Sequence, residues 1–167
     1  NTFEQLFVGI DWASGVESDE TVISILNSKG EQLYIDGFNN LNTTQTIDRL
    51  MSIIGNHLHQ IVSITAETNS IGKPFTDLLT ERLPQSQRHK IQGFTTTNTS
   101  KSELVSDLQV AFQSNQITIL GDEKQLRQLS IYSAEYNAKT KNVTYNAPRG
   151  MHDDRVMALM LSYKGYK

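Results

Sequence analysis

LFVGIDW, at residues 6–12, is the stretch that decides the fold, because it is an apolar run that ends on the carboxylate of Asp11. A run of strand-forming residues without alternating polarity indicates a strand that is buried on both faces. Buried carboxylates are rarely left without a partner, so Asp11 requires a bound cation or a nearby base. Small turn residues at 13–15 place this carboxylate at a strand end that faces a crevice. The alternative is that Asp11 merely starts a turn.

The segments that follow predict a meander and then a crossover. Two further strands, at 21–26 and 32–38, are joined by a short turn and should pair antiparallel. A helical repeat of apolar residues then covers 47–58, with Thr43 or Thr44 as its cap, and leads to a strand at 61–67 that ends on Glu67. A right-handed strand–helix–strand crossover places this strand parallel to the first. Asp11 and Glu67 should therefore lie at the same edge of one sheet.

The remainder of the chain supplies mainly helices. We expect helices at 75–83 and 102–113, a helix capped by Asp122, a hairpin with a basic tip within 132–150, a final helix from Asp153, and short strands at 89–94 and 117–120. This order is typical of the ribonuclease-H-like α/β fold. In it, a three-stranded antiparallel meander is followed by parallel strands in one mixed central sheet, with helices on both faces. Residues 1–167 should form a single domain.

Composition narrows the chemistry that the chain can perform. No cysteine occurs among the 167 residues, so a metal would be held by oxygen or histidine ligands, which favours Mg²⁺ or Mn²⁺. Residues 1–70 carry two basic and nine acidic residues, whereas residues 71–167 carry thirteen basic and nine acidic residues. This asymmetry suits a cation site beside a surface that meets phosphates, although ordinary solvated charge is the alternative. We expect no membrane span and no secretory leader, and hence a soluble intracellular protein.

Three acidic positions stand out: Asp11, Glu67 and the pair formed by Asp153 and Asp154. Carboxylates brought together by the fold repel one another unless cations are bound. Such a cluster supports phosphodiester hydrolysis by two metal ions, which lie about 3.5–4 Å apart in known sites. Asp11 would bridge the ions, Glu67 would bind one and Asp154 the other. Asp154 is preferred to Asp153 because Met157, Ala158 and Leu161 share its side of the final helix, although either acid could instead cap that helix.

Three motifs together resemble a known family. GIDWA at residues 9–13, AETNSIG at 66–72 and GMHDDRVMAL at 150–159 are similar to the nuclease domain of the large terminase subunit of tailed bacteriophages. The resemblance implies an endonuclease that cuts concatemeric viral DNA during genome packaging, with Asp11, Glu67 and Asp154 as catalytic acids. It also places Asp19 where some members carry an additional acid near the metals.

The resemblance further implies a larger protein and its partners. Full terminases carry an ATPase motor, but the sequence contains no phosphate-binding GxxxxGK[ST] motif. Because the chain also begins with Asn, we expect it to be the C-terminal nuclease part of a longer protein. Its partners would be double-stranded DNA, the ATPase domain, the portal and the small terminase subunit, in the cytoplasm of an infected or lysogenic bacterial host.

Basic residues near the expected site would contact the DNA backbone rather than the bases. The candidates are Lys73, Lys101, Lys139, Lys141, Arg149 and Arg155. Three other functions remain open. The first is a RuvC-like Holliday junction resolvase, the second is an actin- or sugar-kinase-like phosphotransferase, and the third is a non-catalytic DNA-binding or assembly module of the same fold. The phosphotransferase fold needs a second related domain and glycine-rich phosphate loops, and the chain has neither.

Overall fold

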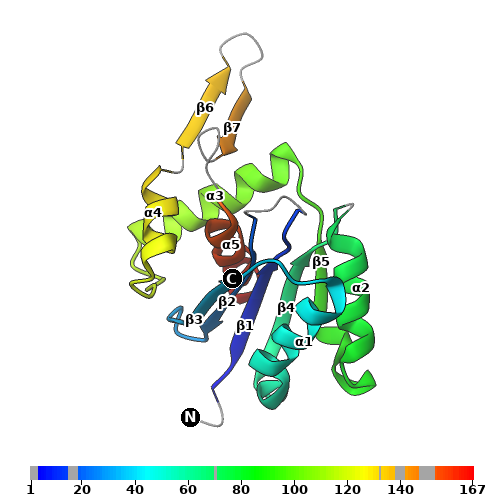
Figure 1. Cartoon of the computed structure of the whole chain (residues 1–167). Coiled ribbons are helices and arrows are strands. Elements are labelled where there is room, and N and C mark those ends of the chain that lie inside the picture. The colour runs from blue at the N-terminus through cyan, green and yellow to red at the C-terminus, as the bar shows by residue number, and fades with distance from the viewer. Residues whose placement is uncertain (1–3, 15–18, 70, 132, 138–141, 147–152) are drawn as a thin grey trace.

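The chain folds around a five-stranded mixed sheet in the order β3-β2-β1-β4-β5, as seen in the computed structural model (Figure 1). The structure describes residues 4–14, 19–69, 71–131, 133–137, 142–146 and 153–167. The strands of this sheet are β1 (Leu6–Asp11), β2 (Thr21–Asn27), β3 (Gln32–Phe38), β4 (Ile61–Glu67) and β5 (Ile91–Phe94). The helices are α1 (Thr43–Ile54), α2 (Gly72–Arg82), α3 (Asn98–Gln113), α4 (Glu123–Ile131) and α5 (Asp154–Tyr166), with short 3₁₀ turns at Gly55–His57 and Gln85–Lys90.

The pairing of the strands confirms the predicted fold class. β1 pairs antiparallel with β2, and β2 pairs antiparallel with β3, whereas β4 lies parallel to both β1 and β5. In the parallel register, Ile10 of β1 stands opposite Ala66 of β4. The next residues along the two strands are Asp11 and Glu67, so both acids reach the same edge of the sheet.

Helices cover both faces of the sheet and make two apolar cores. On one face, α1 and α2 pack against β1 and β4, with Ile10, Ile47 and Leu79 among the fully buried side chains. On the other face, α5 lies across β1, β2 and β4 and contacts α3 and α4. Residues 155–163 of α5 are all buried, so this helix is enclosed by protein on every side. Burial of α5 brings its first turn to the edge that carries Asp11 and Glu67.

Gly9 allows α5 to approach β1 closely. A Cβ atom at this position would collide with the backbone of α5 at Ala158 and Ser162. Helix backbone therefore rests directly on strand backbone at the middle of β1. The position of Asp154, one turn before Ala158, depends on this contact.

Some element boundaries differ from those expected. Asn42, not Thr43 or Thr44, caps α1 through a reciprocal pair of hydrogen bonds with Gln45. α3 begins at Asn98, earlier than 102, because Thr97 and Ser100 form a capping box inside the polar run. The strand expected at 117–120 is wrong: Thr118 makes an isolated bridge to Glu31 instead.

The hairpin predicted before the last helix is present as β6 (Ser133–Asn137) paired antiparallel with β7 (Asn142–Asn146). Its tip, at residues 138–141, lies outside the described residues. In the part of the chain that the structure describes, no helix combines the length and the apolar character that a membrane crossing needs.

Candidate active site

Asp11 is the buried centre of the site. It ends β1 with only 7% of its surface exposed. Its neighbour Trp12 is also buried and stacks on Phe75 with ring centroids 5.0 Å apart. The Trp12 indole N–H donates to the backbone carbonyl of Glu67 and to the hydroxyl of Thr76, at 3.1 Å each. Trp12 therefore packs in the core and joins the ends of β1 and β4 beside the two acids.

Glu67 lies at the end of β4, one strand away from Asp11, and is half-buried. Its carboxylate Oε2 accepts a hydrogen bond of 2.7 Å from the Thr96 hydroxyl. Thr96 follows β5, which is the parallel neighbour of β4. Residues at the ends of three adjacent strands thus meet at one edge of the sheet.

Asp153 and Asp154 separate at the start of α5 and take different partners. Asp154 lies close enough to Asp11 for its negative charge to raise the pKa of Asp11, and its carboxylate accepts a hydrogen bond from the backbone N–H of Glu20 at 3.3 Å. Asp153 occupies the N-cap position without making a side-chain cap, and it pairs with the ammonium group of Lys101 at 3.1 Å. This division agrees with the angle of about 100° between successive residues of a helix.

Burial, together with the repulsion between neighbouring carboxylates, raises the pKa of two acids in this cluster. The pKa of Asp11 is raised well above its usual value by burial, then by the negative charges of Asp154 and Glu67, and by that of Asp153. Burial also raises the pKa of Asp154, against the opposing effect of the Glu20 amide. A proton or a cation is required here because several carboxylates cannot ionise together at close range.

Asp19 lies beside the same cluster. It is half-buried just before β2, and its charge contributes to raising the pKa of Asp154. Within the described ranges, however, no three histidine, aspartate or glutamate side chains are already arranged to hold a metal ion. The acids lie at one edge of the sheet, and contacts with Thr96, Lys101 and the Glu20 amide hold their side chains.

The basic residues expected to meet DNA occupy different environments. Lys73, on the first turn of α2, is exposed and pairs with Asp77. Lys101 reaches into the acid cluster, with 17% of its side chain exposed. Three candidates lie outside the residues whose side chains are described: Lys139, Lys141 and Arg149.

Arg155 is not a surface residue. It is 4% exposed, and its guanidinium group pairs with Glu20 and Asp122 at 3.2 Å each. A Cβ atom on Gly37 would collide with the Glu20 carboxylate and crowd the Arg155 guanidinium group, so the ion cluster fills the space above β3. Arg155 therefore links α5 to the segment before β2 and to the start of α4. Its positive charge pairs with acids inside the protein rather than facing the surface where DNA would bind.

Three neighbours of the site were not predicted from the sequence: Glu20, Thr96 and Asp122. The rule that identified Asp11 and Glu67, a polar residue where a buried strand ends, also applies to the residues that follow β5 and would have indicated Thr96. No comparable signal was present for Glu20 or Asp122, because their partner Arg155 is more than 30 residues away in sequence.

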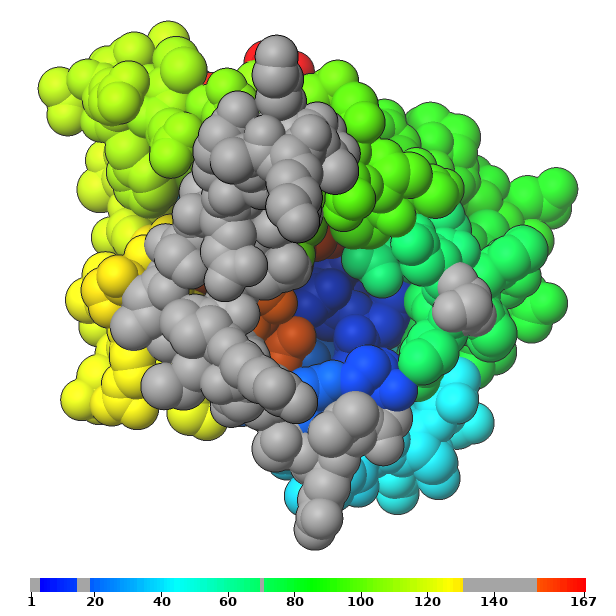
Figure 2. Space-filling view, turned by 90° about the horizontal axis from the view of Figure 1, so that it is seen from above, coloured from blue at the N-terminus to red at the C-terminus, as the bar shows by residue number. Residues whose placement is uncertain are grey.

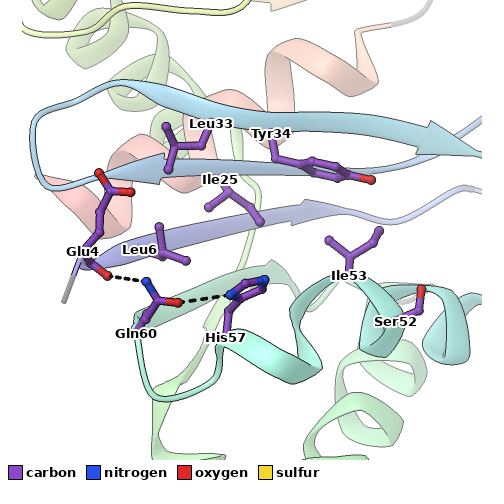
Figure 3. A pocket seen from close by; sticks show the side chains of 9 residues that line it. All are labelled: Glu4, Leu6, Ile25, Leu33, Tyr34, Ser52, Ile53, His57 and Gln60. Atoms are coloured by element: carbon purple, nitrogen blue, oxygen red, sulfur yellow. Dashed lines mark hydrogen bonds between the residues drawn. The ribbon is translucent and has the colours of Figure 1, made fainter. Parts of the chain in front are cut away.

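The surface is hollowed at the acidic edge. Seen from above, the hollow opens over the blue end of β1 and the orange start of α5 (Figure 2). A separate cavity of about 650 Å³ lies at the opposite end of β1, where Leu6, Ile25, Tyr34 and Ile53 line it (Figure 3). That cavity is remote from the acids, and its lining is mainly apolar. We assign the chemistry to the acidic edge because the titratable groups gather there.

Comparison with known proteins supports the assignment of the fold. Residues 8–164 match the family described as the Terminase RNaseH-like domain. No curated protein matches the sequence. The structure is similar to the large terminase nuclease from thermophilic phage G20c, with a TM-score of 0.81 and 22% identity over 100% of this chain and 85% of that chain. The G20c nuclease has also been solved with bound cobalt and with bound magnesium.

Two further solved structures are similar. The large terminase nuclease domain of Thermus phage P74-26 has a TM-score of 0.77 and 20% identity over 96% of this chain and 78% of that chain. The nuclease domain of the large terminase g2p from bacteriophage SPP1, solved with bound Mn, has a TM-score of 0.59 and 12% identity over 97% of this chain and 86% of that chain. At these identities the likeness establishes the fold.

Proposed function

Because this chain belongs to the Terminase RNaseH-like domain family, we propose that it is a metal-dependent endonuclease that cuts concatemeric viral DNA during genome packaging. The observation that carries the proposal is the meeting of Asp11, Glu67 and Asp154 at one edge of the sheet, with the pKa of Asp11 raised by its burial and by the charges of the other two acids. A cation bound at this edge would relieve the repulsion between these carboxylates.

The donor atoms fit a hard divalent cation. The cluster offers carboxylate oxygens from three different elements, and Mg²⁺ and Mn²⁺ both accept such ligands. Similar terminase nucleases with bound magnesium, cobalt or Mn support the same choice. We assign two ions to this site, which Asp11, Glu67 and Asp154 would hold. Asp19 and Asp153 are the additional acids within the same surroundings.

The residues of the chain prepare the site for phosphodiester hydrolysis. When bound, the two cations would activate a water molecule and stabilise the leaving oxygen of the DNA backbone. The carboxylates of Asp11, Glu67 and Asp154 would hold these cations at the edge of the sheet. Lys101 keeps one positive charge beside Asp153, and the ion cluster of Arg155 holds the first turn of α5 in place. No serine or cysteine nucleophile is needed.

DNA would lie over the hollow at the acidic edge and be held through its phosphates. Lys73 stands exposed near that edge, at the start of α2 just after Glu67. We retain Lys101 and the three basic residues of the hairpin region, Lys139, Lys141 and Arg149, as further phosphate contacts. Binding through phosphates would be salt-dependent and have little sequence preference.

In the cell, the nuclease would act as one part of a packaging machine. We propose that it belongs to a longer large subunit with an ATPase domain and works with a portal and a small terminase subunit in the cytoplasm of the bacterial host. The similarity to the nuclease domains of other phage large terminases supports this setting.

A plasmid-cleavage assay tests the proposal. Purified protein should nick or linearise plasmid DNA in the presence of Mn²⁺ or Mg²⁺, and EDTA should abolish cleavage. Asp11→Asn and Glu67→Gln should be inactive, whereas Asp77→Asn, which removes an exposed acid of α2, should cleave normally. Cleavage that survives Asp11→Asn would overturn the site. Preference for four-way junctions over linear duplex would instead favour a resolvase.

A further inference from the structure

Thr96 is held in place by a neighbouring side chain. The Oδ1 atom of Asn69 accepts from the Thr96 backbone N–H at 2.8 Å, and the Nδ2 atom of Asn69 donates to the Thr96 carbonyl at 2.9 Å. The ladder between β4 and β5 also continues past the strands, because the Thr68 N–H donates to the Phe94 carbonyl at 2.9 Å. The backbone of Thr96 is therefore fixed on both sides before its hydroxyl is considered.

The Thr96 hydroxyl donates directly to Glu67. A carboxylate can only accept, so the hydroxyl supplies the proton of the 2.7 Å bond to Oε2. This length is typical of a hydroxyl that donates to an ionised group. A carboxylate held by one oxygen keeps its other lone pairs for a cation. The β-branched threonine restricts the direction in which its hydroxyl can point.

Helix capping does not explain this arrangement. The cap of α3 is Thr97, whose side chain accepts from the Ser100 N–H at 3.0 Å. Thr96 precedes the cap and turns its hydroxyl to the acid cluster instead. Glu67 is half-buried, so water could have satisfied its carboxylate without a protein donor. A fixed donor sets the direction of the carboxylate as well as satisfying it.

We propose that Thr96 is a positioning residue of the nuclease site, secured by Asn69, and that it sets the direction of the Glu67 carboxylate before a cation binds. The inference rests on the proposed function, because it concerns the same cation site. Partners that orient a ligand in this way typically contribute about 10–100-fold to metal affinity or activity. The chain thus prepares one of its ligands through hydrogen bonds between the ends of β4 and β5.

The test is a calorimetric titration of the metal-free protein with Mn²⁺, without DNA, in parallel with thermal unfolding in EDTA. Thr96→Val keeps the shape of the side chain and removes the hydroxyl, so Mn²⁺ binding should weaken about 10-fold or more. Thr96→Ser restores the hydroxyl and should bind within about 2-fold of the original protein. Thr99→Val, an exposed change on the same segment, is the matched control and should bind normally.

The outcomes separate this inference from the proposed function. If the original protein binds Mn²⁺ and cleaves DNA while Thr96→Val binds Mn²⁺ equally well, the positioning role is overturned and the nuclease assignment stands. If the original protein neither binds Mn²⁺ nor cleaves DNA, the proposed function fails. If Thr96→Val unfolds at a lower temperature in EDTA, Thr96→Ala tests the same loss of the hydroxyl without adding a second methyl group. The inference requires that this variant also bind Mn²⁺ more weakly than Thr96→Ser.

Discussion

The two ends of β1 differ in what they gather around them. At the carboxyl end, Asp11 meets acids from β4 and α5, and burial and neighbouring charges raise its pKa. At the amino end, Leu6 lines a cavity of about 650 Å³ whose polar groups are joined by ordinary hydrogen bonds, including one between His57 and Gln60 (Figure 3). Among the described residues, the cavity end gathers no cluster of acids like the one around Asp11. Crowded charge, rather than available volume, therefore marks the end that we assign to chemistry.

The largest difference between the two ends should be in catalysis. Asp11→Asn should reduce plasmid cleavage by about 1,000-fold or more, in the range seen when a member of a catalytic unit is removed. The rate is measured as the conversion of supercoiled plasmid with Mn²⁺. If Leu33→Ser, a change at the amino end of β1, reduced the cleavage rate as much, catalysis could not be assigned to the carboxyl end alone.

Removing the buried positive charge of Arg155, near the acidic end, should affect stability more than catalysis. Arg155→Met leaves the half-buried Asp122 without its cation and leaves Glu20 with only the exposed Lys124, so the free energy of unfolding in urea should fall by up to about 3–5 kcal/mol. Adding Glu20→Gln and Asp122→Asn should recover part of this loss, because no charge is then stranded. Native stability together with weaker DNA binding in Arg155→Met would instead make Arg155 a phosphate contact.

The crowded acids should also destabilise the metal-free protein. The pKa of Asp11 in the folded protein lies above its value in the unfolded chain, so stability falls as the pH rises through the folded pKa. In EDTA at neutral pH, Asp11→Asn should therefore raise the Tm, by about 2–4 °C for each kcal/mol gained. The variant should also lose part of the pH dependence. A lower Tm for Asp11→Asn would show that the charged group is well accommodated.

DNA binding should distinguish a lysine at one end of the sheet from a lysine at the other. Lys73 stands beside the acidic edge, whereas Lys29 lies in the turn between β2 and β3 at the cavity end. Lys73→Met should reduce the slope of log Kobs against log salt concentration by about 0.9, the contribution of one phosphate contact. Lys29→Met should leave the slope unchanged. Equal slopes for the two variants would remove Lys73 from the DNA surface.

The smallest effect should come from the cavity itself. Leu33 is 44% exposed at its rim, so Leu33→Ser should change the free energy of unfolding by no more than about 0.5 kcal/mol. Cleavage should stay within about twofold of the original rate, because no acid of the cluster lies there. The same plasmid assay and urea titration measure both quantities.

The fold was predictable from local pattern together with one rule of handedness. Each early element has a clear local pattern: β1 is a continuous apolar run, β2 and β3 are strands joined by a short turn, and the helix before β4 has apolar residues at helical spacing. The right-handed crossover then places β4 beside β1. Once these strands are parallel, Asp11 and Glu67 must share an edge. The strand predicted at 117–120 was wrong. Its β-branched residues favour a strand locally, but in the fold Ile117 is buried against α3 and α5.

The interior of the site was less predictable because its partners come from distant parts of the chain. Arg155 follows two acids and resembles a surface base in sequence, yet α5 is buried around its whole circumference. Its pairing with Glu20 and Asp122 depends on how α4 and the start of β2 pack against α5. The spacing of residues along the sequence does not reveal this packing. Thr96 lay within a polar run that indicated only a loop.

Manganese anomalous diffraction from crystals of this chain soaked with Mn²⁺ would test the central claim most directly. We predict strong peaks bounded by the carboxylates of Asp11, Glu67 and Asp154, with Asp11 contacting both ions. Peaks should disappear in crystals of Asp11→Asn. Absence of a peak at these three acids in the original protein, or a strong peak only at the opposite end of β1, would contradict the assignment.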